Sequence, residues 1–319
     1  MVRSTVIGRA RRRTFAPLAL VGAVSLMVSA ALHGQSAATG SAALDTLLQR
    51  AGATAPGTYA MNGTALEPVA TPLAVLLQAD VTRGPERRIR VPVAVGAELK
   101  QAADVRLRVV SVAAAGQASR TLGDATGSGG VGPLRFVHEF ALPPGDYEIQ
   151  AVIGESKGAA ATLAKSRVTV PDIWGGSLAV TPIFLGDEPG TSRSRPFNFG
   201  ATALIPASGP GFSQSGSVRA AFRIFNWSAG TGEKPDLTVE YLFYERGTKG
   251  LHFFNKMKPQ RLTAATLGST FDPANGSVST GMLVPLEAFT FGRFQLKVTV
   301  TDNRNKQSAG QATEFTVSP

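Results

Sequence analysis

Apolar and polar residues alternate one by one along several segments of this chain, and this pattern constrains the fold more than any other feature. In the segment 88–95 (RIRVPVAV), Ile89, Val91, Val93 and Val95 share one parity, whereas arginine, proline and alanine occupy the other. Successive side chains of a β-strand point to opposite faces, so strict alternation indicates a strand with one buried face. Such segments recur about every 8–12 residues with turn-forming clusters between them, which indicates packed β-sheets.

The alternating segments form two groups, separated by a short glycine-containing stretch. Further side chains are expected in the cores because they share the buried parity of their segments: Val105, Leu107, Val109, Tyr147, Ile149, Ala151, Ile153, Val168, Val170, Val218, Ala220, Phe222, Ile224, Leu237, Val239, Tyr241, Phe243, Phe294, Leu296, Val298 and Val300. The sequence therefore predicts an all-β protein of two tandem β-sandwiches, one over 69–172 and one over 177–319.

Two connections are predicted in the first sandwich. The glycine- and serine-rich segment 117–133 is expected to be a loop. The segment 136–153 is expected to be a hairpin, because Pro143-Pro144-Gly145-Asp146 offers turn-forming residues between two strand-like runs.

The N-terminus predicts an export signal over residues 1–35. The first 14 residues contain five arginines and no acid, the segment Phe15–Leu32 is uncharged and apolar, and small residues follow. This order is typical of a secretory signal peptide. We expect a periplasmic or extracellular protein, which would contact the membrane only if the signal stays uncleaved as an anchor.

Residues 36–68 are expected to form a short helix followed by a linker. Leu44, Leu47 and Leu48 lie at helical spacing within 41–51, and Gly52 follows as a stop signal. The segment 54–68 is rich in alanine, glycine, threonine and proline, which favours a linker.

Charge and cysteine content exclude several classes of function. The formal net charge of +10 falls to +5 without the five arginines of the signal, which leaves 27 basic and 22 acidic residues. A nucleic-acid partner is therefore not expected. The chain has no cysteine, so disulfides, thiolate metal sites and cysteine nucleophiles are excluded.

The last two strands of each predicted sandwich resemble those of immunoglobulin-like and fibronectin type III-like modules. Each sandwich ends in a turn, an aromatic residue, an alternating strand, a loop and a final Thr-Val strand. Tyr147 stands where such folds place a tyrosine corner, in which a buried ring bonds upstream backbone through its hydroxyl. Phe294 occupies the equivalent position of the second sandwich and lacks the hydroxyl. We interpret the repeat as two related domains.

A closer resemblance is to the tail modules of bacterial exported proteins known as VWFA-related. It rests on LPPGDY (142–147), VTVPD (168–172), LAVTPIFL (178–185) and PDLTVEY (235–241). The von Willebrand A domain of that family is missing, and so is its Asp-x-Ser-x-Ser metal motif. The resemblance implies an exported protein of immunoglobulin-like sandwiches, without catalytic residues or a metal to carry over.

Arginines form the first candidate binding surface. Arg88 and Arg90 share one strand face, Arg106 and Arg108 share another, and Arg83 and Arg87 lie nearby in sequence. If the two strands were neighbours, their guanidinium groups would form a site for an anionic polysaccharide, a lipid head group or an acidic partner. The alternative is a solvated sheet face whose charges prevent edge aggregation.

Aromatic residues form the second candidate surface. Phe225 and Trp227 lie on the strand face opposite Phe222, and Tyr244 likewise opposes the core residues of its own strand. An exposed platform of Trp227, Phe225 and Tyr244 would suit sugar stacking or a protein anchor. The alternative is that both sheet faces are covered, one of them by a loop or by the first sandwich.

No reaction is predicted. The three histidines lack partners at motif spacing, and no nucleophile elbow, zinc motif or phosphate loop occurs. The turns with Asp302 and Asp272 offer too few carboxylates for calcium. We expect no metal and no cofactor, and an exported, non-enzymatic protein with a structural or protein-interaction role in the cell envelope. Its partner would be an envelope protein or an anionic or neutral polysaccharide; the alternative function is a carbohydrate-binding module.

Overall fold

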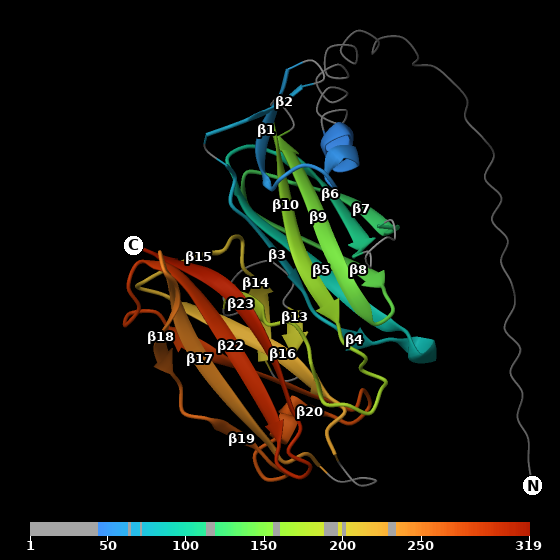
Figure 1. Ribbon diagram of the computed structural model, residues 1–319, viewed down its shortest axis with the longest axis vertical. Coiled ribbons are helices and arrows are strands. Elements are labelled where there is room, and N and C mark those ends of the chain that lie inside the picture. The colour runs from blue at the N-terminus through green and yellow to red at the C-terminus, as the bar shows by residue number, and fades with distance from the viewer. Residues whose placement is uncertain are drawn as a thin grey trace, which may run out of the picture.

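Two bodies built from strands make up the structure (Figure 1). The computed structural model describes residues 44–62, 65–70, 72–112, 119–155, 160–187, 197–199, 202–228 and 234–319. The predicted signal over 1–35 lies outside the described residues. The body from the N-terminal half is blue to yellow-green in Figure 1, and the body from the C-terminal half is yellow to red. The all-β prediction is confirmed.

The first body is a sandwich of two sheets. Its strands are β1 (Gly57–Asn62), β2 (Ala65–Pro68), β3 (Val75–Ala79), β4 (Thr82–Arg83), β5 (Ile89–Leu99), β6 (Ala103–Ser111), β7 (Thr121–Gly129), β8 (Gly132–Ala141), β9 (Gly145–Glu155) and β10 (Ala160–Val170). Sheet A has the order β2-β1-β10-β9-β6-β7. In sheet B, β5 pairs with β8 on one side and with β3 and β4 on the other. The short 3-10 turn η1 (Pro85–Arg87) connects β4 to β5.

The second body is also a sandwich. Its strands are β11 (Ala179–Val180), β12 (Phe184–Asp187), β13 (Phe197–Phe199), β14 (Thr202–Pro206), β15 (Gly211–Ser213), β16 (Ser217–Phe225), β17 (Leu237–Gly247), β18 (Gly250–Lys256), β19 (Gln260–Leu262), β20 (Phe271–Asp272), β21 (Ser277–Pro285), β22 (Gly292–Asp302) and β23 (Ser308–Ser318), with η2 (Gly268–Thr270) before β20. Sheet C has the order β13-β14-β12-β16-β21-β20, with β11 on β16. Sheet D has the order β15-β23-β22-β17-β18, with β19 on β17.

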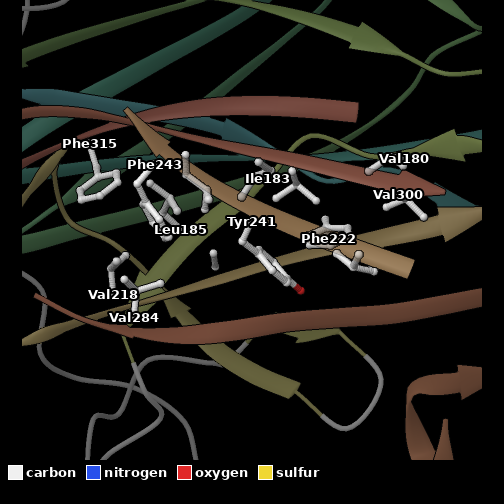
Figure 2. Close-up of a cluster of buried hydrophobic side chains, with 14 of the residues drawn as sticks. Val180, Ile183, Leu185, Val218, Phe222, Tyr241, Phe243, Val284, Val300 and Phe315 are labelled. Atoms are coloured by element: carbon white, nitrogen blue, oxygen red, sulfur yellow. The ribbon is translucent and has the colours of Figure 1, made fainter. Parts of the chain in front are cut away.

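Each sandwich has its own apolar core, and period-two alternation predicted both. Every side chain that was expected inside is buried, from Ile89 at 3% exposed to Val168 at 7% and Phe294 at 0%. Figure 2 shows part of the second core, where the rings of Phe222, Tyr241 and Phe243 lie among aliphatic side chains. Burial at about 25 cal/mol per Å² of apolar surface makes these cores the main source of stability in a chain without disulfides.

The predicted hairpin over 136–153 is wrong. β8 pairs with β5 in sheet B, whereas β9 pairs with β6 and β10 in sheet A, so the proline-containing turn crosses from one sheet to the other. The tyrosine corner expected at this turn is present: the ring of Tyr147 is 4% exposed, and its hydroxyl donates to the backbone oxygen of Pro143 at 2.7 Å. This bond fixes the crossing.

The predicted loop over 117–133 is also wrong, because β7 and the start of β8 occupy most of its described part. β7 is rich in glycine because the large side chains of β8 fill the space beneath it. A Cβ on Gly127 would lie 2.3 Å from the Phe136 ring, and one on Gly129 would lie 2.6 Å from Leu134. The glycines are thus a packing requirement of a strand.

The predicted linker over 54–68 is a pair of strands, because β1 pairs with β10 and β2 pairs with β1 at the edge of sheet A. The predicted helix is confirmed over residues 44–50. Its leucines are buried on the outer face of sheet A, against Val152, Ala161 and Leu163. Within the described part of the chain, no helix is long and apolar enough to cross a membrane.

Candidate functional site

The outer face of sheet B lies directly on the outer face of sheet C, and this contact forms a joint between the sandwiches. Ala94 of β5 is buried in a cluster with Phe184, Phe199, Leu204 and Ala221 of the second sandwich. Backbones approach closely beside this cluster: a Cβ on Gly96 would lie 2.1 Å from the oxygen of Ala207. The alternation in β5 therefore serves two interfaces, with its valines in the first core and its small residues in the joint.

Buried polar groups form directional hydrogen bonds across the joint. The side-chain amide of Gln78 donates to the backbone oxygen of Leu185 at 2.8 Å, and its oxygen accepts the Leu185 N–H at 2.5 Å. Through these two bonds, the side-chain amide of Gln78 pairs with the backbone of β12 as a neighbouring strand would. Arg135 of β8 donates to the oxygen of Pro206 at 2.7 Å. Such bonds are directional, so they set the register of one sandwich on the other.

A buried ion pair lies at the centre of the joint. Arg223 Nε of β16 lies 3.0 Å from Asp80 Oδ2, and Asp80 is 1% exposed. Arg223 also donates to the hydroxyl of Ser279 and to the backbone oxygen of Asn198. Burial raises the pKa of the Asp80 carboxyl above its ordinary value, although Arg223 acts to lower it. Asp80 Oδ1 has no hydrogen-bond partner among the described residues.

Arg83 of the first sandwich contacts both the connecting segment and the second sandwich. Its guanidinium donates to the backbone oxygens of Ile173 at 2.7 Å and Asn275 at 2.8 Å. Its Cζ lies 4.5 Å from the centre of the Trp174 ring and 5.3 Å from that of Phe225. Burial lowers the pKa of Arg83 below its ordinary value. Hydrogen bonds and cation–π contacts thus fix Trp174 from the side of the joint.

A pocket of about 540 Å³ opens beside Arg83 and is the candidate functional site. It lies between the start of β5, the β8–β9 turn and the connecting segment, and it is lined by Arg87, Arg88, Ile89, Ala141, Leu142, Pro143, Pro144, Asp172 and Trp174. Its walls are mostly apolar, and its charged side chains are two arginines and one aspartate. Asp172 Oδ1 accepts the backbone N–H of Trp174 at 3.0 Å, which orients the connecting segment. Pockets of this size and composition commonly take small ligands or single side chains.

The structure separates the four candidate arginines. The condition for one shared arginine surface, that the two strands are neighbours, is not met, because β5 belongs to sheet B and β6 to sheet A. Arg106 and Arg108 bind acids on their own side, at Asp45 and Asp124. Arg88 and Arg90 pair with the exposed Glu86 and Glu139. Arg88 alone of the four lines the pocket.

Trp227, Phe225 and Tyr244 do not form an aromatic platform. Phe225 is 1% exposed, because the first sandwich covers its face of sheet C, as the alternative interpretation required. Trp227 is half-buried against the second core and contacts the Phe271 ring at 6.0 Å between centres. Tyr244 lies on sheet D, beside the 59% exposed Phe253. The three residues therefore have three different environments, with Phe225 on sheet C, Trp227 in the segment after β16 and Tyr244 on sheet D.

The acidic turns have structural roles. Asp302 is 1% exposed and accepts hydrogen bonds from the backbone and hydroxyl of Ser228 and from the Arg304 N–H. Asp272 accepts bonds from Ala274 and Asn275 within its own turn. Among the described residues, no group of three or more histidine, aspartate or glutamate side chains is placed to hold a metal.

Three residues of this region were not singled out from the sequence: Trp174, Asp80 and Arg223. The sequence gives only a weak indication that Trp174 belongs to a site. It is a large aromatic residue in a glycine-containing connection, outside the alternating segments that form the cores. Asp80 and Arg223 are 143 residues apart, and neither stands in a motif. Only the packing of sheet B on sheet C brings them together.

Comparisons with known proteins assign no family. No family model matches the chain, and no curated protein matches it. Solved structures with similar arrangements include red sea bream transglutaminase, with 11% identity over 76% of this chain and a TM-score of 0.22. They also include Escherichia coli alpha-2-macroglobulin activated by porcine elastase, with 10% identity over 83% of this chain and a TM-score of 0.22. The chain covers 31% and 25% of these proteins, and at this similarity neither assigns an activity, substrate or partner.

Proposed function

We propose that this chain is an exported, non-enzymatic β-sandwich protein with a structural or protein-interaction role in the cell envelope. The joint between the sandwiches supports this most directly. Independent domains move relative to one another unless their interface is extensive and apolar. Here apolar packing, the Gln78 bonds and the Asp80–Arg223 pair hold the sandwiches in one orientation. A fixed orientation suits a spacer, or a platform that presents a contact site.

The sequence supports the export and the relationship that we propose. Residues 1–35 have the order of a signal peptide, which supports a location in the periplasm or outside the cell. The motifs at 142–147 and 178–185 are those by which the chain resembles tail modules of VWFA-related proteins, and the corner bond of Tyr147 is consistent with immunoglobulin-like architecture.

Export is tested by following the N-terminus. The full chain is expressed in a bacterial host, and the N-terminal peptide of the protein from each cell fraction is identified by mass spectrometry. We expect a periplasmic or secreted product that begins after the apolar run, and a cytoplasmic precursor when Leu20→Asp places a charge in that run. An intact N-terminus on cytoplasmic wild-type protein would contradict export.

The interaction role is tested by capture with matched variants. Purified wild-type protein, Trp174→Ala and Arg293→Ala are immobilised and exposed to solubilised envelope proteins. Arg293 is exposed on β22, away from the pocket-lining residues. We expect a partner that the wild type and Arg293→Ala retain and that Trp174→Ala loses. A partner retained equally by all three would contradict a role for the pocket, and no retention would leave only the structural role.

A further inference from the structure

The pocket beside Trp174 combines an apolar interior with a cationic rim. Ile89 and Leu142 are 3% and 5% exposed, and Pro143 and Pro144 form part of the wall. Proline has no backbone N–H, so this wall offers few donors and favours apolar groups. Burial of an apolar side chain of a ligand against such a wall favours binding.

Arg87 supplies a positive charge to the rim. No carboxylate of the described residues forms an ion pair with its guanidinium, whose Cζ lies 5.8 Å from the centre of the Trp174 ring. Arg88 forms an ion pair with Glu86, with 3.3 Å between Nη2 and Oε2, and both of those side chains are highly exposed. An exposed pair of this kind is weak, so a ligand carboxylate can compete for Arg88. The Asp172 carboxylate already accepts a hydrogen bond from the backbone N–H of Trp174.

Both sides of the pocket are held in place before any ligand binds. Glu86 and Arg87 have left-handed backbone angles, with φ of 55° and 58°, in a turn closed by the bond from Gly84 N–H to the Arg88 oxygen at 2.8 Å. Consecutive non-glycine residues in this region are uncommon and strained, and they persist where the surrounding structure holds them. On the other side, Arg83 braces Trp174 through the joint. A preformed site loses little conformational entropy on binding.

The lining favours a peptide over a polysaccharide. A sugar ring has hydroxyls around its edge, and most of them would lose water against isoleucine, leucine and proline without gaining a partner. A short peptide segment can place one large apolar side chain in the pocket and an adjacent carboxylate on the arginine rim. Guanidinium and carboxylate groups form two parallel hydrogen bonds, which would fix the direction of the peptide.

We infer that the pocket binds a segment of a partner protein in which a large apolar residue is adjacent to an aspartate or glutamate. The apolar side chain packs on Trp174 and Leu142, and the carboxylate pairs with Arg87, with Arg88 in support. This inference rests on the proposed interaction role and adds the chemistry of the partner.

The chain contains two tryptophans, Trp174 and Trp227, so a Trp227→Phe background leaves the pocket residue as the only indole reporter. This protein is titrated with the peptide Ac-Gly-Glu-Phe-Gly-NH2, and Trp174 fluorescence is followed. Two matched peptides replace the glutamate by glutamine or the phenylalanine by alanine. We expect saturable binding of the first peptide and at least about tenfold weaker binding of each matched peptide, which corresponds to about 1.4 kcal/mol.

Protein variants complete the test. Arg87→Ala is expected to weaken the Glu-Phe peptide about tenfold and to leave the Gln-Phe peptide unchanged, whereas Arg293→Ala changes neither. Trp174→Ala, followed by calorimetry, is expected to lose binding, and circular dichroism checks that each variant is folded. Equal affinity for the glutamate and glutamine peptides, tighter binding of an oligogalacturonate than of the peptide, or no saturable binding would each overturn the inference. A protein captured through Trp174 despite such a result would leave the proposed function intact and reject only this partner chemistry.

Discussion

Replacement of Arg223 by methionine tests the joint through the buried pair with Asp80. The methionine keeps much of the aliphatic volume but leaves a carboxylate that is 1% exposed without its cation, and it removes the bonds to Ser279 and Asn198. Loss of one partner from a buried pair typically costs about 3–5 kcal/mol at neutral pH. We expect a loss of this size, because Asp80 Oδ2 would lose its bond from Arg223 and Asp80 Oδ1 has no hydrogen-bond partner among the described residues.

The loss should depend on pH in a defined direction. Burial raises the pKa of folded Asp80 above its unfolded value, so the folded state binds the proton more tightly. Stability therefore falls as pH rises from the unfolded pKa of Asp80 through its folded pKa. Removal of Arg223 raises the pKa further, because the arginine opposes the effect of burial. The cost of Arg223→Met should therefore be small near pH 4 and grow towards pH 7. The added change Asp80→Asn should recover much of the stability at neutral pH.

Urea denaturation of the purified variants, followed by tryptophan fluorescence between pH 4 and 7, measures these free energies. Arg293→Ala, which removes an exposed arginine, is the matched control and should cost less than about 1 kcal/mol. A cost for Arg223→Met below about 1 kcal/mol at neutral pH, or a cost that does not change with pH, would refute the assignment of a buried pair in the joint.

Three further changes test the packing and the pocket. Gly96→Val should separate the sandwiches, because even a Cβ would lie 2.1 Å from the Ala207 oxygen, and small-angle scattering should show expansion that Gly130→Ala, in open space, does not cause. Tyr147→Phe should lower the free energy of unfolding by about 0.5–1.5 kcal/mol in urea titrations, since it removes the bond to Pro143, and an unchanged midpoint would contradict the corner. Trp174→Phe should leave stability nearly unchanged, because the indole N–H has no acceptor among the described residues, and a loss of 2 kcal/mol or more would contradict that geometry.

The cores could be predicted because one physical property, the alternation of side chains along a strand, determines them locally. Ile89, Val93 and Phe294 are buried as their parity requires. The same rule placed Phe225 on the face opposite Phe222, but the sequence left open whether solvent or the first sandwich covers that face.

Connections between sheets could not be predicted in the same way. The turn at Pro143–Asp146 has the residues of a hairpin, yet it carries the chain across the sandwich, because the partner of each strand is set by contacts far away in sequence. The glycines of β7 resemble those of a loop, and their reason becomes visible only when Phe136 and Leu134 lie beneath them.

The joint and the pocket depend on still longer separations. Arg83 donates a hydrogen bond to Asn275, which is 192 residues away in the sequence. Trp174 becomes part of a pocket only when the β8–β9 turn and the start of β5 lie beside the connecting segment. Local patterns contain no information on such contacts. Whether the strands of Arg88 and Arg106 are neighbours could not be predicted for the same reason, and these strands belong to different sheets.

Spin-label distances show whether the two sandwiches form one rigid unit. The chain has no cysteine, so Thr126→Cys on β7 and Lys297→Cys on β22, both exposed, give one label on each sandwich. Double electron–electron resonance should give a single narrow distance distribution, which broadens when Gly96→Val is added. A broad distribution in the protein without Gly96→Val, unchanged by that substitution, would show that the sandwiches move independently and are not one rigid unit.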